Sequence, residues 1–375
     1  MKYDGICPVE ARFVKQDGLF PEIYRCMEES KYVLVLADRD TAERAGAKEL
    51  CAGAQAKCVL FTDITPNPRI TDVFRCLEAV QWEPTDLIVA IGGGSTIDVA
   101  KCVSALKRMM RGGLTLEKVA DAIRNKKYLG NDDVIDIVAV PTTAGTGSDV
   151  TKWATVWDME EGKKLSVDSP LLYPKVSLQS ADLTMTMPPK LTLSTGLDAL
   201  SHAMESFWAR ARTPVNQEIA LSAISIIRDY LPKVMENGDD RTAREKMMLG
   251  ALLAGIAFSC TRTTACHSIS YPLTMEYKVP HGFAAALTLY DVAKLNEKDV
   301  PEIARIWELF GGRDGFKKWM NGVSEGVQEL RLSAFGVDRD GMKDMAERSF
   351  TLGRMDNNPS EISVQDVYHI LCGIY

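Results

Sequence analysis

One acidic residue and three histidines in the middle of this chain are of the types that bind a divalent metal. Asp198 and His202 stand four residues apart in a segment typical of a helix, so their side chains share one face. His267 and His281 follow, and the chain has only 4 histidines in all. One carboxylate and three imidazoles without a thiolate suit Fe(II) or Zn(II). The alternative is that Asp198 starts a helix and the histidines belong to the core, because such pairs are common in helices.

The elements that must position these residues begin with alternating strands and helices. Continuous apolar runs are typical of strands buried on both faces, and their alternation with helices predicts a parallel, doubly wound sheet with right-handed crossovers. Two further runs, 151–158 and 163–167, predict a hairpin added to that sheet. The predicted strands of the sheet are 32–37, 57–61, 86–91 and 134–140, and the helices among them are 42–51, 70–80 and 96–108.

Beyond about Asp182 the strand signals fade and the pattern becomes helical. Pro188 and Pro189 mark the join. The sequence therefore predicts an α/β dinucleotide-binding domain over 1–182 and an all-helical metal-binding and substrate domain over 183–375. The predicted helices of the second domain are 191–209, 214–235, 240–259, 262–275, 283–296, 299–310, 313–327, 339–350 and 363–373.

Two loops at strand ends have the composition of phosphate-binding loops. Residues 92–95, Gly-Gly-Gly-Ser, join a predicted strand to a helix, where backbone N–H groups can point at an anion. Residues 141–148 are rich in threonine and glycine and follow the next strand. Asp38 ends the first strand, where an acid accepts from a ribose hydroxyl and repels a 2′-phosphate, which favours NAD(H) over NADP(H). The alternatives are a plain tight turn at 92–95 and a helix cap at Asp38; GxGxxG is absent.

Composition excludes several classes of partner. A net charge of -7 argues against nucleic acid, and the longest apolar run, 247–258, is too short to span a membrane. The 9 cysteines are scattered without CxxC pairs, as in a protein of the reducing cytoplasm. The first ten residues have no apolar signal core. We therefore expect a cytoplasmic enzyme with a small-molecule substrate.

Four motifs together point to a resemblance to a known enzyme family, and they lie at 92–101, 141–150, 196–205 and 280–282. On these segments the chain resembles the iron-containing (group III) alcohol dehydrogenases along nearly its full length. The resemblance implies a dehydroquinate synthase-like architecture, a homodimer or larger homo-oligomer, and one divalent metal, Fe(II) before Zn(II) or Ni(II). It implies metal ligands at Asp198, His202, His267 and His281. It also implies nicotinamide-dinucleotide contacts at Asp38, Asn67, Gly93, Gly94, Ser95, Asp98, Thr142, Thr143 and Lys164.

A narrower resemblance points to one branch of that family. Segments 151–158, 200–208 and 261–264 look like the phosphonoacetaldehyde reductases, also called hydroxyethylphosphonate dehydrogenases. Arg262, followed by Thr263 and Thr264, puts a guanidinium beside hydroxyls, which suits an oxyanion of the substrate. The alternative is that Arg262 forms a structural ion pair.

The residues and the resemblance together predict a metal-dependent aldehyde reductase and alcohol dehydrogenase. The metal would act as a Lewis acid on the carbonyl, with His267 in the catalytic set, and nicotinamide would deliver the hydride. Many members carry a further histidine four residues after the third ligand; here Tyr271, or a water, must supply the proton. Phosphonoacetaldehyde, reduced to 2-hydroxyethylphosphonate, is one candidate substrate. The rivals are a butanol- or propanediol-type dehydrogenase, a dehydroquinate synthase-like lyase, and a non-catalytic metal or nucleotide binder.

Overall fold

The first half of the chain folds around a parallel six-stranded sheet. The computed structural model describes residues 7–375, so the expectation about the start of the chain lies mostly outside the described residues. The strand order is β1-β8-β5-β4-β2-β3, and every pairing is parallel. The strands are β1 (Glu10–Phe13), β2 (Tyr32–Leu36), β3 (Lys57–Phe61), β4 (Leu87–Gly92), β5 (Asp136–Pro141) and β8 (Val176–Gln179).

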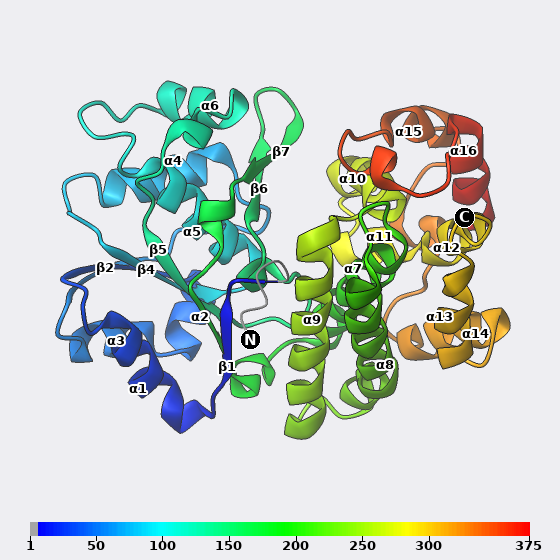
Figure 1. Ribbon diagram of the computed structural model, residues 1–375, viewed down its shortest axis with the longest axis horizontal. Coiled ribbons are helices and arrows are strands. Elements are labelled where there is room, and N and C mark those ends of the chain that lie inside the picture. Colours follow the sequence, from blue (N-terminus) through cyan, green and yellow to red (C-terminus); the bar gives the residue numbers. More distant parts are fainter. Residues whose placement is uncertain (1–6) are drawn as a thin grey trace.

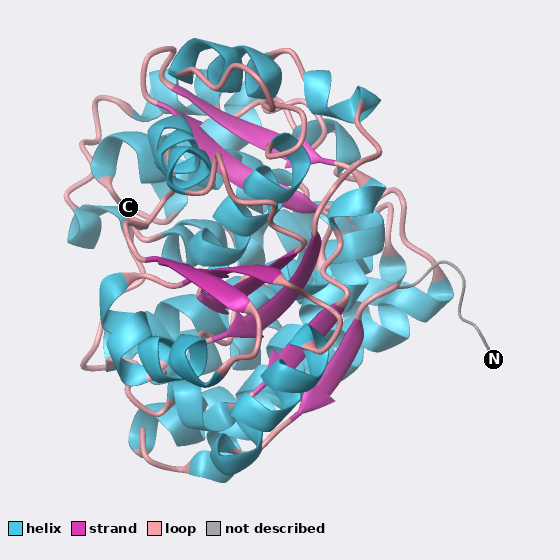
Figure 2. Cartoon of the chain, turned by 90° about the vertical axis from the view of Figure 1, so that its left-hand side faces the viewer, coloured by secondary structure: helices cyan, strands magenta, loops and turns pink. Residues whose placement is uncertain are grey.

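Helices cover both faces of this sheet because successive side chains of its central strands point to opposite sides. Val33 and Val35 of β2 belong to one apolar cluster, and Leu34 and Leu36 belong to another. Figure 1 shows one group of helices on each side, and Figure 2 shows the sheet between them. One group is α1 (Gln16–Met27), α2 (Arg39–Arg44) and α3 (Ala47–Gly53); the other is α4 (Ile70–Ala79), α5 (Gly94–Leu106) and α6 (Leu116–Arg124).

The second half is helical and packs around one long buried helix, α7 (Pro189–Trp208). Its neighbours α8 (Pro214–Glu236), α9 (Arg241–Thr261) and α11 (His281–Ala286) pack against it in one apolar core. This confirms the predicted fold class, an α/β half followed by a helical half (Figure 1). The remaining helices are α10 (Ala265–Tyr277), α12 (Leu289–Asn296), α13 (Ala304–Leu309), α14 (Arg313–Ser324), α15 (Met342–Arg348) and α16 (Val364–Gly373).

Several predicted elements differ from the structure. The hairpin, β6 (Trp153–Asp158) and β7 (Lys163–Asp168), forms its own antiparallel sheet, so its predicted placement on the main sheet was wrong. Outside that sheet, β6 makes an isolated bridge to Arg69, at the start of α4. The helix predicted at 42–51 is two helices, because Gly46 has a left-handed backbone with φ 66. The helix predicted at 283–296 is likewise α11 and α12.

Within residues 7–375, no single helix is both long and apolar enough to cross a membrane. Helices α9 and α10 meet that test only as a pair bent by 106°. The bend places the start of α10 beside α7, and that junction carries the candidate site.

Candidate metal centre and dinucleotide cleft

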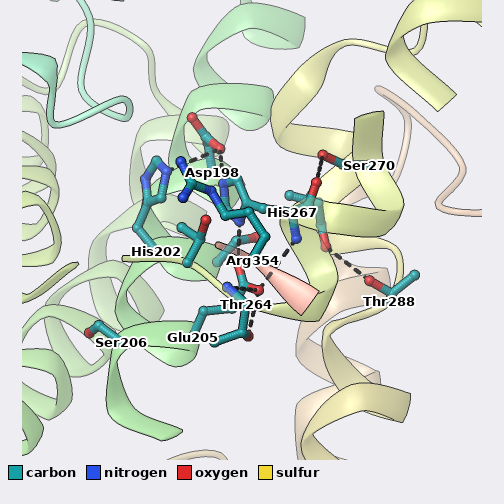
Figure 3. Close-up of polar contacts among 12 residues, drawn as sticks. Asp198, His202, Glu205, Ser206, Thr264, His267, Ser270, Thr288 and Arg354 are labelled. Atoms are coloured by element: carbon teal, nitrogen blue, oxygen red, sulfur yellow. Dashed lines mark hydrogen bonds and ion pairs between the residues drawn. The ribbon is translucent and has the colours of Figure 1, made fainter. Parts of the chain in front are cut away.

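Helix α7 presents Asp198 and His202 on one buried face, as their spacing predicts. The Oδ1 atom of Asp198 lies 3.9 Å from Nε2 of His202 and 3.6 Å from Nε2 of His267, which comes from α10. His281 begins α11. Figure 3 shows Asp198, His202 and His267 converging from α7 and α10. Side chains from these helices therefore gather around Asp198.

The polar atoms of this group fit a cation. Ligand atoms of Asp198, His267 and His281 all lie within 4.8 Å of one another. The fourth predicted ligand, His202, stands outside that group and stacks its ring on that of His267 at 4.7 Å. Oδ1 of Asp198, Nε2 of His267 and Nδ1 of His281 are buried without a hydrogen-bond partner. Buried polar atoms are ordinarily paired, so three orphans in one cluster indicate a missing partner. A divalent metal bound by nitrogen and oxygen ligands meets that need.

Glu205 fixes the orientation of His267, a role that the sequence analysis did not assign. Its fully buried carboxylate accepts from Nδ1 of His267, from the backbone N–H of Thr264 at 2.9 Å and from the hydroxyl of Thr264 at 2.7 Å. With Nδ1 donating to Glu205, the lone pair of Nε2 faces the cluster. The seven-residue spacing from Asp198 to Glu205, which keeps both on one helix face, was the available signal.

The α/β half orients His202 in the same way, through its backbone. Nδ1 of His202 lies 3.3 Å from the carbonyl oxygen of Gly145, which turns Nε2 towards Asp198. The loop can approach so closely only because residue 145 is glycine: a Cβ there would lie 2.5 Å from the carbonyl oxygen of Thr195. The loop at 141–148 therefore contacts both the metal cluster and α7.

The electrostatics favour the metal-binding protonation state of three of the four predicted ligands. Burial raises the pKa of Asp198, but His202 and the other imidazoles outweigh it and hold that pKa below its ordinary value. Burial lowers the pKa of His202 to about 4 and that of His281 well below its ordinary value. Burial also lowers the pKa of His267, but Glu205 and Asp198 outweigh it and raise it to about 9. The ionised carboxylate of Asp198 and the neutral imidazoles of His202 and His281 are already in the state that ligates a cation, whereas His267 must release a proton when the cation binds.

A cavity of about 360 Å³ opens beside the cluster and contains further charged groups. All four predicted ligands line it, together with Tyr271, Lys164 and Arg354. The ammonium of Lys164 lies 4.0 Å from the centroid of the Tyr271 ring, and Nε of Arg354 donates to the Tyr271 hydroxyl at 3.3 Å. Burial raises the pKa of Tyr271, but Lys164 and Arg354 outweigh it and lower that pKa to about 8. Arg354 is a further charged residue that the sequence pattern did not predict, because it lies in an irregular segment far along the chain.

The three residues predicted to bind the substrate are placed differently. Thr263 lines the cavity, whereas Arg262 and Thr264 do not. Arg262 pairs with Asp168 of β7, which is the structural ion pair that the sequence left as the alternative. Thr264 is fully buried, and its hydroxyl accepts from the Trp208 indole at 2.9 Å and donates to Glu205.

The predicted dinucleotide contacts divide between this cavity and an adjoining one of about 720 Å³. Asp38 lines the second cavity, where it also caps α2 by accepting from the Thr41 N–H at 3.0 Å. Asp98 lines the first, and its carboxylate accepts from Ser148 at 2.5 Å and from the Thr155 N–H at 2.8 Å. The second cavity also contains Gly93, Gly94, Ser95, Thr142 and Thr143, and the first contains Asn67, Gly94, Ser95 and Lys164. Gly94 and Ser95 border both, so the cavities form one cleft.

Comparison with known proteins covers nearly the whole chain. Residues 11–180 match the family described as iron-containing alcohol dehydrogenase, and residues 192–375 match the C-terminal part of the Fe-containing alcohol dehydrogenase family. An NAD-dependent methanol dehydrogenase of Bacillus methanolicus is 30% identical over 328 residues, covering 83% of this chain and 83% of the relative. An NADPH-dependent butanol dehydrogenase of Clostridium saccharobutylicum is 31% identical over 347 residues, covering 86% and 85%.

A solved structure agrees along the full length. The sulfoacetaldehyde reductase from Bifidobacterium kashiwanohense, crystallised in complex with NAD+, superposes with a TM-score of 0.85 and 30% identity, covering 100% of this chain and 99% of that one.

Proposed function

This chain belongs to the iron-containing alcohol dehydrogenase family, and we propose that it is a metal-dependent, NAD(H)-using reductase of small aldehydes that also oxidises the matching primary alcohols. The observation that carries this proposal is the set of orphaned buried atoms on Asp198, His267 and His281. They face a cavity that is continuous with the glycine- and threonine-rich loops. A cation site and a dinucleotide cleft that meet in this way suit hydride transfer to a carbonyl.

Asp198, His202, His267 and His281 would hold the cation, Fe(II) before Zn(II) or Ni(II). When bound there, the cation supplies Lewis-acid polarisation of the substrate carbonyl. Glu205 orients the imidazole of His267 on α10, and the carbonyl of Gly145 orients that of His202 on α7, so that both rings point towards Asp198.

The reaction transfers two electrons. When bound, NADH would supply both electrons as a hydride to the carbonyl carbon and would be oxidised to NAD+, and the carbonyl oxygen would take a proton from the protein. Tyr271 holds a proton on a hydroxyl that Arg354 fixes within the cavity, so we assign it as the proton donor.

The loops of the α/β half bind the cofactor. Backbone N–H groups at Gly93 to Ser95 stand at the start of α5, where an anion is favoured. Asp38 lies in the same cavity, and its carboxylate favours NAD(H) over NADP(H).

Two substrate classes suit the cavity. Phosphonoacetaldehyde, reduced to 2-hydroxyethylphosphonate, suits its cationic groups. A neutral butanol- or propanediol-type substrate suits the aromatic rings of Trp153, Trp157 and Phe258, which also line it. Homodimer formation and cytoplasmic location stay predictions.

The test begins with protein stripped of metal and reloaded with Fe(II), Zn(II) or Ni(II). We expect aldehyde-dependent oxidation of NADH, followed at 340 nm, to require the metal and to be slower with NADPH. Tyr271→Phe should lower kcat by about 100-fold, the usual worth of a general acid. Tyr277→Phe, on the same helix but outside the cavity, is the control. No NADH oxidation with any aldehyde and any metal would refute the proposal, as would a lyase reaction that regenerates its NAD.

A further inference from the structure

Two cationic side chains in the metal cavity have no carboxylate partner. Lys164 projects from β7 of the α/β half over the Tyr271 ring. Arg354 belongs to the helical half, as Tyr271 does, and donates to the Tyr271 hydroxyl. Among the described residues, neither forms an ion pair with an acidic side chain. Their sequence neighbours behave differently, because Lys163 pairs with Glu161 at 2.9 Å and Arg262 pairs with Asp168.

The acidic groups of the cavity are already engaged. Asp98 accepts from Ser148 and from the Thr155 N–H, and Asp198 belongs to the metal cluster. A cation that is partly buried without a counter-charge is costly, so two of them in one cavity indicate that an anion binds there. The diphosphate of the cofactor has its own site, because the phosphate-loop residues Gly93, Thr142 and Thr143 line the adjoining cavity and not this one.

The segment that carries Arg354 is firmly held. Asn357 donates from its side chain to the carbonyl oxygens of Thr261 and Thr263 at 2.8 and 3.0 Å. The Thr351 N–H donates to the hydroxyl of Ser268 at 2.9 Å. These bonds tie the segment to the junction of α9 and α10, which presents His267. The guanidinium is therefore positioned relative to the metal cluster by the same backbone that positions a ligand.

We propose that Arg354 and Lys164 form the subsite for an anionic group on the aldehyde substrate, a phosphonate or sulfonate carried one carbon from the carbonyl. This deepens the proposed function and rests on it. The planar fork of Arg354 can take two oxygens of such a group, and Lys164 adds a point charge. Tyr271 contacts both cationic groups, and its ring lies 6.3 Å from that of His281, so the subsite is close to the metal cluster and suits a short substrate. Arg354 thereby takes the role that the sequence assigned to Arg262.

The first experiment compares charged and neutral substrates. Values of kcat/KM are measured with NADH for phosphonoacetaldehyde, sulfoacetaldehyde and propanal, using the metal-loaded protein and its Arg354→Gln, Arg354→Lys and Lys164→Gln variants. We expect the wild type to prefer an anionic aldehyde. Arg354→Gln should lower the ratio of anionic to neutral kcat/KM by about 10- to 100-fold, the usual worth of hydrogen bonds to a charged group. Arg354→Lys should restore part of it.

Two control variants locate the effect. Lys163 is exposed and does not line the cavity, although it is the neighbour of Lys164 in the sequence. Lys163→Gln should therefore leave the ratio of anionic to neutral kcat/KM unchanged. Arg262→Gln tests the rival position. A loss of the ratio in Arg262→Gln with none in Arg354→Gln would overturn the inference.

A binding measurement separates failure of the subsite from failure of the enzyme. Ethylphosphonate has no carbonyl, and its affinity for the holoenzyme with NAD+ is measured by calorimetry. We expect binding that weakens by about 10- to 100-fold in Arg354→Gln. If propanal is reduced but neither anionic aldehyde is preferred, the inference fails while the proposed function stands. If no aldehyde is reduced, the proposed function fails. In that case, ethylphosphonate binding that depends on Arg354 still supports the anion subsite, and a lack of such binding refutes the subsite. Sulfonate preferred over phosphonate, or the reverse, identifies the group and supports the subsite in either case.

Discussion

The two halves of the cleft bind their ligands with different parts of the chain. The α/β half offers mainly backbone N–H groups and hydroxyls, at residues 93–95 and 142–143. The helical half offers ionisable side chains on α7, α10 and α11, and two of them, His202 and His267, are each oriented by a second group. Backbone sites depend on the path of the loop, and so on glycine, whereas side-chain sites depend on each residue and on its partner. Single substitutions should therefore act more strongly on the helical side.

The sharpest test of this difference is Glu205→Gln, for which we expect the largest effect. The amide keeps the size of the side chain but removes the charge that faces Nδ1 of His267. Loss of such a partner typically costs about 10- to 100-fold in metal affinity. Competition with a chromophoric chelator measures that affinity, and unfolding of the metal-free protein shows whether the fold is intact. Glu218→Gln, at an exposed pair with Arg305, is the matched control. Unchanged metal affinity in Glu205→Gln would contradict the role of this carboxylate.

The same difference decides how much of the site could be predicted from sequence. Asp198 and His202 could be paired because helical spacing fixes their shared face. The phosphate loops could be placed because strands β4 and β5 are continuous apolar runs whose ends are marked by glycine or proline. Arg354 could not be placed, because it follows Gly353, with φ 80, in a segment without regular periodicity. Glu205 lies in a recognisable motif, but its role depends on the approach of α10.

The fold was likewise predictable where the signal is local. Strands β2 to β5 were identified from sequence, whereas β1 and β8 were missed because each has only four residues. β1 lies at the edge of the sheet and is mostly exposed, so its sequence has no apolar run. The separate sheet of β6 and β7 was missed for a different reason: hairpin pairing is local, but its docking depends on distant residues such as Arg124.

Asp38 tests the α/β half, because it is an ionisable side chain among predicted cofactor contacts that are otherwise mainly backbone and hydroxyl groups in that cavity. Asp38→Ala should raise the KM for NADH and lower the preference for NADH over NADPH by about 10-fold, the worth of a hydrogen bond to a charged group. It also removes the cap of α2, which should cost about 1 kcal/mol of stability. Steady-state kinetics with both cofactors and thermal unfolding measure the two effects. Glu43→Ala, exposed on the same helix, is the control. A loss of stability with an unchanged cofactor preference would reduce Asp38 to a helix cap.

The smallest effect is expected at the hairpin, where the α/β half delivers a side chain, Lys164, into the metal cavity. Asp158 is 2% exposed and accepts from Arg124 at 2.5 and 2.9 Å, which ties β6 to α6. The hydrogen bonds from Arg124 lower the pKa of Asp158 below its ordinary value, despite burial. A carboxyl whose pKa is lower in the folded than in the unfolded protein stabilises the folded state at pH values above its unfolded pKa of about 3.9. This stabilisation is lost as the pH falls through the folded pKa.

Asp158→Asn should therefore lower the melting temperature by a few degrees at pH 7, and the difference from wild type should shrink as the pH falls below about 4. Thermal unfolding of the metal-loaded protein, followed by circular dichroism between neutral and acidic pH, measures this. Glu160→Gln removes an exposed partner of the same Arg124 and should change the melting temperature little, because surface pairs contribute weakly. A difference that stays constant with pH would mean that Asp158 acts through packing, and that the charge of Arg124 does not hold the hairpin over the cavity.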